Sequence, residues 1–438
     1  MSIDTKKLYQ TETIKALQNF SVSGVSFSVD LAKNIALIKK EVAIVNMELG
    51  YLDKKISQAI VKASDEMIAG HWNQQIVVDQ IQGGAGTSMN MNVNEIIATR
   101  ATEILKNVVV AHPLEHVNKT QSTNDVAPTA LRITILQKID HLLIILREYQ
   151  AELKKKGQEF KTVMKVGRTH LQDAVPVSLG REFLAQTSAM GEDIKRLKQA
   201  QNSLLNINLG GTAIGTMANS SPIFTNLVVK RLAQVTNYKL KSAPDLVYAT
   251  QYVDDFTTVS AVLAILSTNL VKFLNDLRLM ASGPRAGWGE ISFAELQKGS
   301  TIMPGKVNPV AAEMLTQIAF QVLGNNQTIL LAAQAGQFEL NVMLPVITKN
   351  ILESLRFLDK GLGLFTKYGL KTLRANRERC QQLLNDSLVG ATALSKVIGY
   401  ERTEKILKKA SAGQKSLMEI VATEKIMSQK DFEKLLKE

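Results

Sequence analysis

The sequence predicts an all-α protein that is built around long helices. Hydrophobic residues make up 45% of the chain and aromatic residues only 5%. Leu, Ile, Val and Ala supply most of the apolar content, which is typical of a mainly helical protein. Only nine prolines occur in 438 residues. Four of the intervals between successive prolines are roughly 35 to 47 residues long, and because an interior proline breaks a helix, very long helices can form there.

A chain of this length is expected to form two or three domains, and the patterning favours three. The first, residues 1–121, carries short helical patterns and a glycine-rich break at residues 83–86. The second, residues 122–370, holds the long proline-free intervals and is predicted to be a long-helix bundle. The third, residues 371–438, is polar and charged, with short helices broken by glycines.

Two segments carry the prediction of the bundle. In the first, apolar residues recur at spacings of three, four or seven, the pattern of a helical seam; they are Leu179, Phe183, Met190, Ile194, Leu197 and Leu204. In the second, residues 246–280, a long helix is apolar on more than one side. A helix that is apolar nearly all round is buried by its own bundle or by other subunits, so we expect an oligomer.

The charge balance bears on the partners of the chain. The net charge is +12, from 52 basic and 40 acidic residues. No window combines clustered Arg and Lys with interleaved aromatic residues, so a nucleic-acid partner is not expected. The densest basic runs, residues 154–156 and 408–409, resemble solvated helix faces. A positive field that attracts small dianions is the better functional interpretation.

The cysteine count and the apolar windows bear on the compartment. Cys380 is the only cysteine, which excludes a disulfide framework and a cysteine-based metal site. The first ten residues lack the layout of a signal peptide. The most apolar window, residues 259–266, is far shorter than a membrane span. We therefore expect a cytoplasmic protein that does not bind membranes.

Four polar segments interrupt the apolar pattern, at residues 83–95, 118–125, 167–176 and 299–309. Ser, Thr and Asn cap helices and form turns far more often than they bind ligands, so one such segment alone decides little. Together they supply neutral donors, a few cations and one histidine, without a nucleotide loop or metal-ligand spacing. That set suits a small polar anion held by many hydrogen bonds.

The fourth segment, GSTIMPGKVNP, is the most informative. Two adjacent hydroxyls, Ser300 and Thr301, are followed by a cation and an amide, Lys306 and Asn308. Gly305 lets the backbone approach a ligand closely, and the Lys–Asn pair is suited to holding a carboxylate. The glycines and prolines predict an articulated loop, with a helix that starts near Pro309.

The four segments, in this order, resemble the motifs of the fumarase/aspartase superfamily, and GSTIMPGKVNP resembles its signature loop. The resemblance extends from LYQTETIKALQNF near the start to IGYERTEKILKKA near the end. It implies a homotetramer whose central helices form a twenty-helix bundle, with each active site built from three subunits. It also implies a cofactor-free β-elimination that releases fumarate from a succinyl-type substrate, and none of the predicted site residues is a metal ligand.

The wording of the motifs is closer to the aspartase branch than to the fumarase branch. Residues 85–88 (AGTS), Thr123 and the stretch AGQFELNVM have the aspartase form. Against this, His170 follows Thr169 as in fumarases, and Leu344 stands where aspartases usually have Glu. Residues 112–116 depart from the stretch that forms a second dicarboxylate site in fumarases. The resemblance thus implies elimination of ammonia from L-aspartate through an enediolate, with hydration of fumarate to L-malate as the alternative.

The resemblance also assigns roles to individual residues, and each role suits the chemistry, because removing a proton next to a carboxylate places two negative charges on it. Ser300 would be the base, with its anion stabilised by loop amides and by Lys306. The β-carboxylate would be held by Thr87, Ser122, Thr123 and Thr301, the α-carboxylate by Lys306 and Asn308, and the departing amino group would lie by Asn124, Thr169 and His170, with Glu313 paired to His170. The superfamily usually has Ser where this chain has Thr301.

A third alternative is a relative without enzymatic activity, as among the lens crystallins related to this superfamily. Such a protein is expected to have a damaged site. Ser300, Lys306, Asn308 and His170 are all present. The sequence therefore favours an enzyme.

Overall fold

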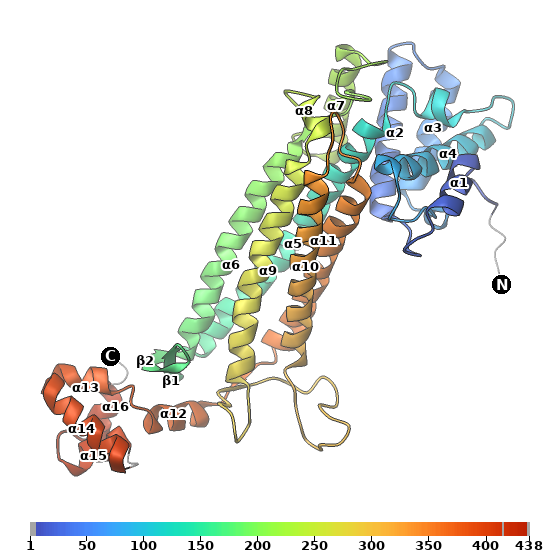
Figure 1. The fold of residues 1–438 in the computed structure, drawn as a ribbon. Coiled ribbons are helices and arrows are strands. Elements are labelled where there is room, and N and C mark those ends of the chain that lie inside the picture. Colours follow the sequence, from blue (N-terminus) through green and yellow to red (C-terminus); the bar gives the residue numbers. More distant parts are fainter. Residues whose placement is uncertain (1–5, 414–415, 436–438) are drawn as a thin grey trace. The chain divides into compact units, whose positions relative to one another are not determined.

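The structure, a computed structural model, describes residues 6–413 and 416–435. Helices make up most of this part of the chain, which confirms the all-α prediction (Figure 1). The strands are short and form two-stranded ladders only. Their bounds are β1 Met164–Thr169, β2 Gln172–Ser178, β3 Asn206–Ile207, β4 Lys241–Ser242, β5 Ile291–Ser292 and β6 Arg374–Ala375.

The chain divides into two compact units, each made of several segments. The first unit contains the chain up to Leu142 together with Lys195–Ile265 and Gln321–Phe357. The second contains Leu143–Ile194, Leu266–Phe320 and the chain from Leu358 onward. The long helices contribute a part to each unit. The three domains predicted at 1–121, 122–370 and 371–438 remain a prediction.

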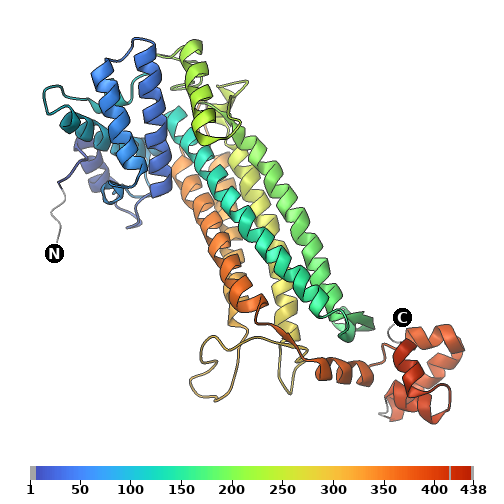
Figure 2. The same cartoon turned by 180° about the vertical axis from the view of Figure 1, so that it is seen from behind.

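Five long helices carry the bundle: α5 Thr123–Glu159, α6 Leu179–Gln201, α9 Asp254–Met280, α10 Val310–Gln334 and α11 Leu344–Phe365. Within each unit, their segments lie side by side in both views (Figures 1 and 2). The predicted seam is confirmed, since five of its six residues are at most 1% exposed and Ile194 is 7% exposed. The helix predicted after Pro309 is α10. The one predicted over residues 246–280 is divided into α8 Tyr248–Gln251 and α9.

Shorter helices complete the first unit. These are α1 Thr11–Asn19, α2 Val29–Glu48, α3 Lys54–Ile68, α4 Thr87–Ile104 and α7 Pro222–Thr236, with the short turns η1 Asn73–Gln75, η2 Gly84–Gly86, η3 Pro113–Val117 and η4 Asn202–Leu205. Buried Glu95 of α4 accepts the backbone N–H groups of Gln10, Glu12 and Thr13. Its carboxylate thus satisfies the free amides at the start of α1 and fixes that helix on α4.

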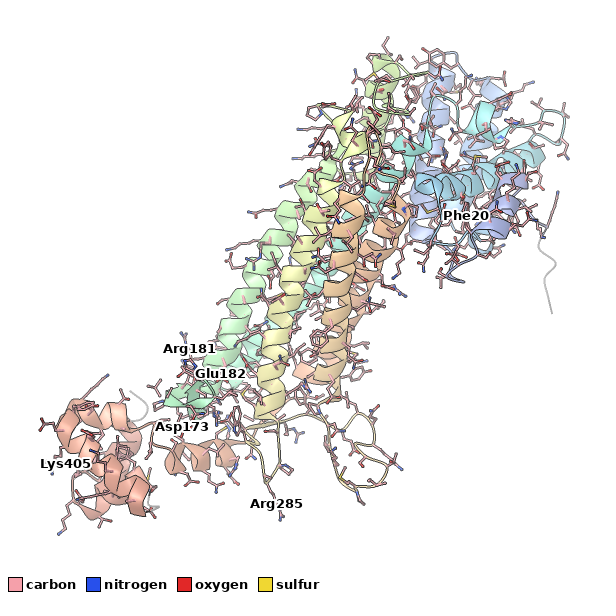
Figure 3. The ribbon with its side chains drawn as sticks, in the orientation of Figure 1. Phe20, Asp173, Arg181, Glu182, Arg285 and Lys405 are labelled. Atoms are coloured by element: carbon pink, nitrogen blue, oxygen red, sulfur yellow. The ribbon has the colours of Figure 1, made fainter. Side chains whose placement is uncertain are left out.

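The C-terminal part of the second unit contains the predicted short helices. After the turn η5 Thr366–Leu370 come α12 Arg377–Asp386, α13 Ala391–Ile398, α14 Tyr400–Gly413, α15 Leu417–Thr423 and α16 Gln429–Leu435. Leu394, Ile406, Leu417 and Phe432 form a small core of their own. Lys405, Lys408 and Lys409 are exposed, as predicted for this basic run, and Figure 3 shows Lys405 on these helices.

The other basic run departs from the prediction. Lys154 and Lys155 are exposed, but Lys156 is only 5% exposed. Its ammonium donates to the carbonyl oxygen of Leu373 at 2.8 Å and to the carboxylate of Glu159 at 3.0 Å. Its position in the run gave no sign of burial, because the acceptor at Leu373 is more than two hundred residues away in sequence.

One helix among the described residues, α9, is long and apolar enough to cross a membrane by length and composition. The mean hydropathy of its most apolar window is 1.5, and half of that window is buried inside the structure. A core helix of a bundle passes the same test. The finding therefore fits the bundle helix that the sequence predicts.

Candidate active site

The first candidate segment turns the chain into α4. Gly84, Ala85 and Gly86 all have left-handed backbones, with φ of 77°, 56° and 96°. Glycine adopts this conformation without strain, which explains two of the three residues. The turn places Thr87 as the first, exposed residue of α4, and its hydroxyl donates to the carbonyl oxygen of Gly84 at 2.7 Å. Thr87 must therefore rotate before its proton can reach a ligand.

The second candidate segment caps α5. The Ser122 hydroxyl oxygen accepts the backbone N–H of Asn124 at 3.2 Å, and the Ser122 N–H donates to Asp125 at 3.0 Å. The hydroxyl oxygen of Thr123 accepts the side-chain amide of Asn90 at 3.0 Å. Because each hydroxyl already accepts a hydrogen bond, each keeps its proton for an outside acceptor. Two adjacent donors at a helix N-terminus suit a carboxylate.

Asn124 is oriented differently. Its side-chain N–H donates to the carbonyl oxygen of Ala213 at 2.7 Å, so the amide oxygen is left as the acceptor. An acceptor is what an ammonium group needs. Thr123 and Gly86 are neighbours, since a Cβ on Gly86 would lie 4.0 Å from the Thr123 methyl. The first unit therefore brings the start of α4 and the start of α5 together.

The third candidate segment is a β-hairpin in the second unit. Strands β1 and β2 pair antiparallel, and the pair Thr169–Gln172 closes a two-residue turn of His170 and Leu171. Both turn residues have left-handed backbones, with φ of 55° and 61°. Such turns favour Asn and Gly, so this one is strained. The turn places exposed Thr169 and His170 at the tip of the hairpin.

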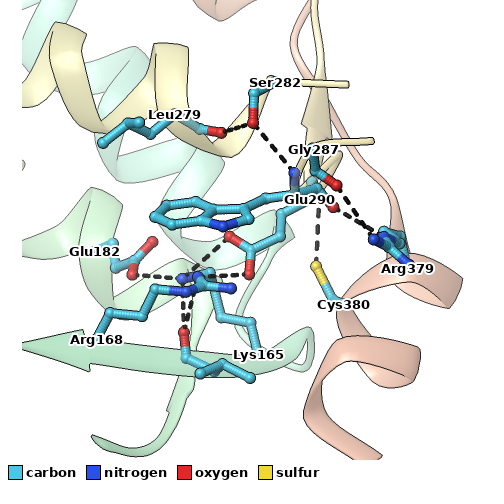
Figure 4. A network of polar contacts seen from close by, with 11 residues as sticks. Lys165, Arg168, Glu182, Leu279, Ser282, Gly287, Glu290, Arg379 and Cys380 are labelled. Atoms are coloured by element: carbon cyan, nitrogen blue, oxygen red, sulfur yellow. Dashed lines mark hydrogen bonds and ion pairs between the residues drawn. The ribbon is translucent and has the colours of Figure 1, made fainter. Parts of the chain in front are cut away.

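A buried ionic network fixes the base of this hairpin (Figure 4). Glu290, fully buried, accepts from Arg168 at 2.8 Å and lies 3.3 Å from the Lys165 ammonium. Lys165 also pairs with Glu182 at 3.0 Å. The Arg168 guanidinium lies 3.9 Å from the centre of the Trp288 ring, a cation–π contact. Arg168, which directly precedes Thr169 and His170, is thus anchored by an ion pair and by a ring contact.

Little in the sequence pattern points to this network. Arg168 belongs to the third polar segment, but Lys165, Glu182 and Glu290 lie outside all four segments. Cys380 is near it, and its thiol donates to the backbone oxygen of Glu290. Burial raises the pKa of Cys380 to about 12, with the Glu290 charge acting in the same direction. The cysteine therefore stays a neutral thiol at physiological pH.

The fourth candidate segment is a closed loop between α9 and α10. The Ser300 hydroxyl oxygen accepts two backbone N–H groups, from Ile302 at 3.2 Å and from Met303 at 3.0 Å. The Asn308 side chain donates to the carbonyl oxygen of Gly299 at 2.8 Å. A Cβ on Gly299 would lie 1.8 Å from the carbonyl oxygen of Lys306, so only glycine allows this closure. The predicted articulated loop is therefore closed at a narrow neck, where Gly299 meets Lys306 and Asn308.

The rest of this segment projects outward. Thr301 and Lys306 are exposed, and Asn308 is half-buried at the neck. Glu313 lies half-buried in the first turn of α10. Among the described residues, no hydrogen bond or ion pair joins Glu313 to His170. That predicted pairing remains a prediction.

The predicted site residues thus form separate groups within one chain. Thr87, Ser122, Thr123 and Asn124 lie in the first unit. Thr169 and His170, on the hairpin, and the residues from Ser300 to Glu313 lie in the second. In the described part of the chain, no three His, Cys, Asp or Glu side chains gather as metal ligands.

Comparisons with known proteins identify the class. Residues 1–324 match the lyase family, and residues 391–437 match the fumarase C C-terminus. The chain therefore belongs to the fumarase/aspartase superfamily of lyases.

Within that superfamily, its similar relatives are aspartate ammonia-lyases. One from Bacillus subtilis (strain 168) is 44% identical over 99% of this chain and 92% of its own length. One from Escherichia coli (strain K12) is 37% identical over 97% of this chain and 90% of its own length.

Solved structures agree with this placement. A fumarate lyase:delta crystallin from Brucella melitensis bound to cobalt has a TM-score of 0.94 and 40% identity, covering 99% of this chain and 96% of that chain. A recombinant class II fumarase from Schistosoma mansoni has a TM-score of 0.92 and 33% identity, covering 99% and 95%.

Proposed function

We propose that this chain is an aspartate ammonia-lyase. It is a carbon–nitrogen lyase that catalyses the reversible anti β-elimination of ammonia from L-aspartate, giving fumarate through an enediolate intermediate. Its relatives from several bacteria carry that name at 37–44% identity over nearly the whole chain. In the geometry, one observation carries the proposal: the Ser300 oxygen accepts two backbone N–H groups.

Ser300 acts as the base that removes the proton from Cβ. A free serine hydroxyl is a poor base, so its anion needs a site that stabilises negative charge. The N–H groups of Ile302 and Met303 supply two hydrogen bonds to this oxygen. Lys306 of the same loop adds a positive charge. Closure of the loop over the substrate excludes water and strengthens both effects.

The enediolate forms on the β-carboxylate, which gains a second negative charge when the proton leaves. Ser122 and Thr123 donate to it, since each hydroxyl keeps its proton free while it accepts from Asn124 and Asn90. Thr87 joins them after rotating away from Gly84, and Thr301 donates from the loop. Donors placed before the charge develops lower the barrier most.

The other end of the substrate is held by different groups. Lys306 and Asn308 bind the α-carboxylate. Asn124 presents its amide oxygen to the departing amino group, because its N–H is engaged with Ala213. Thr169 and His170 lie by the same group, and Glu313 pairs with His170 and fixes the tautomer of its ring.

These groups meet in a homotetramer with a twenty-helix core and with active sites shared by three subunits. Exposed apolar side chains on the long helices support this assembly. In the first unit they include Ile265, Leu330 and Leu331, and in the second Leu279 and Phe320. Partner helices would cover them. The enzyme is proposed to act in the cytoplasm on a small dicarboxylate, without a cofactor, a metal, a nucleic acid or a membrane.

The alternative is a class II fumarase, which adds water to fumarate to give L-malate. It is favoured by His170 after Thr169 and by the fold of the Schistosoma mansoni fumarase. Two assays on the purified protein separate the activities: ammonia released from L-aspartate, and fumarate formed from L-malate. We expect turnover of L-aspartate. Turnover of L-malate without release of ammonia would establish the alternative instead.

A further inference from the structure

A buried lysine lies behind the Ser122–Thr123–Asn124 segment, on a helix that carries none of the predicted site residues. Lys39 is in the middle of α2 and is 0% exposed. Its ammonium donates to the side-chain oxygen of Asn118 at 2.7 Å. Buried lysines are rare unless they are paired. Because burying a charged side chain destabilises the folded state, the burial of Lys39 suggests a role other than stability.

The hydrogen bonds continue from Lys39 to the site. The oxygen of Asn118 also accepts the side-chain N–H groups of Asn90 at 3.1 Å and Asn94 at 3.2 Å. The other N–H of Asn90 donates to the hydroxyl oxygen of Thr123 at 3.0 Å. Lys39 is thus connected to Thr123 through two asparagine side chains.

Lys39 determines which side chain donates and which accepts in each of these hydrogen bonds. In its ammonium form Lys39 only donates, so the Asn118 atom that faces it must be the oxygen. That oxygen can only face the N–H side of Asn90. Asn90 then donates to Thr123, whose own proton is left to point outward. Without a donor-only group at its end, the same set of amides could be reversed.

In the part of the chain that the structure describes, no hydrogen bond to its oxygen fixes the orientation of the Asn90 amide. Its side-chain oxygen is buried and has no hydrogen-bond partner among the described residues. The same is true of the side-chain oxygen of Asn94. The position of the Asn90 amide therefore depends on its two N–H bonds, to Asn118 and to Thr123.

A negative charge that opposes the charge of Lys39 lies in the first turn of α5, directly after Asn124. Asp125, 0% exposed, accepts the N–H groups of Ser122, Gly210 and Thr212, each at 3.0 Å. Burial lowers the pKa of Lys39 to about 7, and the charge of Asp125 opposes that shift. The folded state is therefore destabilised progressively as pH falls from the ordinary lysine pKa to about 7, because in this range the unfolded chain takes up the proton and the folded chain does not. A costly buried charge next to a site points to a functional role.

We propose that Lys39 is a positioning residue for the elimination: by donating to Asn118 it orients Asn90, so that Thr123 presents its hydroxyl proton to the substrate carboxylate. Lys39 does not touch the substrate. This inference rests on the proposed function, in which Thr123 holds the carboxylate that becomes the enediolate.

The test is a double-mutant cycle between Lys39 and Thr123. Lys39→Met keeps the length of the side chain and removes its donor, and Thr123→Val removes the hydroxyl. We expect Lys39→Met to lower kcat on L-aspartate by about tenfold to a hundredfold, with a smaller effect on KM, because the donor acts mainly on the developing charge. In the Thr123→Val background the same change should alter kcat by less than about threefold.

Lys40→Met is the matched control. Lys40 follows Lys39 on α2, but its ammonium pairs with Asp65 at the protein surface, at 2.7 Å. The Lys40→Met substitution should leave kcat unchanged in both the wild-type and the Thr123→Val backgrounds. An equal loss from Lys39→Met in both backgrounds would overturn the proposal, since Lys39 would then act elsewhere. A Lys39→Met protein with the activity of the wild type would also overturn it.

A neutron crystal structure of Lys39→Met, which distinguishes the nitrogen from the oxygen of each amide, tests the positioning without relying on activity. We expect the side-chain amides of Asn118 and Asn90 to reverse in part of the molecules, which exchanges their nitrogen and oxygen positions and removes the hydrogen bond from Asn90 to Thr123. Unchanged side chains would refute the proposal. If the wild type releases no ammonia from L-aspartate, the proposed function fails, and this structure still decides whether Lys39 orients Thr123.

Discussion

Ser300, the proposed base, depends on its local setting. Its hydroxyl oxygen sits at the meeting point of two backbone N–H groups, which lie two and three residues further along the loop. The same arrangement is common in turns with no function. Here the neck at Gly299 and the adjacent Lys306 make it part of a closed, cationic loop. The nearby positive charge and the closed loop are the features that distinguish the proposed base from a serine that only forms a turn.

Ser300→Ala should therefore reduce kcat on L-aspartate by at least about a thousandfold, since the base is removed and no neighbour replaces it. The oligomeric state and the helical content should not change. Steady-state assays, light scattering and circular dichroism measure these three quantities. Ser292→Ala, at an exposed serine of β5, is the control and should keep full activity. Near-normal activity of Ser300→Ala would refute the assignment of the base.

At this scale the sequence indicates candidate site residues that belong to motifs, but not the residues that support them. Ser300, Thr123 and His170 could be identified because each lies in a polar segment with a recognisable order. Lys39 could not, because it is one of two adjacent lysines on a helix, and lysine is nearly always exposed. Only the packing of α2 against α4 and η3 shows which of the two is buried.

At the scale of elements, the hairpin β1–β2 depends on one buried carboxylate. Glu290→Gln removes the charge that Arg168 and Lys165 share. Breaking a buried ion pair leaves an uncompensated charge, so the free energy of unfolding should fall by about 3 kcal/mol. Urea denaturation at a fixed protein concentration measures this change.

A surface pair provides the control for Glu290. Glu404 pairs with Lys408 at 2.8 Å on α14, and both side chains are largely exposed. Glu404→Gln should leave the denaturation midpoint unchanged, because exposed ion pairs contribute little. Equal effects of the two substitutions would show that the Glu290 network does not stabilise the hairpin.

The elements differed in how far the sequence could predict them. The long helices follow from proline spacing and apolar periodicity, and α6 and α10 start where the sequence places a helix. The hairpin could not be predicted, because its turn consists of His170 and Leu171 rather than the usual Asn and Gly. The ionic network that holds it joins residues over a hundred positions apart. Local patterns carry no information about such contacts.

For the whole molecule, the main consequence concerns how a site is assembled. Thr87 and the Ser122 segment belong to one compact unit, and the Ser300 loop and the hairpin belong to the other. The sequence alone cannot say whether these groups meet within one chain or between chains. The resemblance to the superfamily implies that they come from three subunits, and subunit mixing can test this.

Mixing the subunits of two inactive variants should restore activity. One carries Ser300→Ala and the other Ser122→Ala with Thr123→Val. If each site takes the two groups from different chains, random mixing in equal amounts gives about a quarter of the sites both intact groups, and about a quarter of wild-type activity. If one chain supplied both groups, every site would keep a defect and the mixture would stay inactive. Activity on L-aspartate after joint unfolding and refolding distinguishes the two results.

The reciprocal control is a chain that carries all three substitutions, mixed in equal amounts with the wild type. If each site is shared between chains, about a quarter of the sites should again be intact. If each site lies within one chain, about half should be intact.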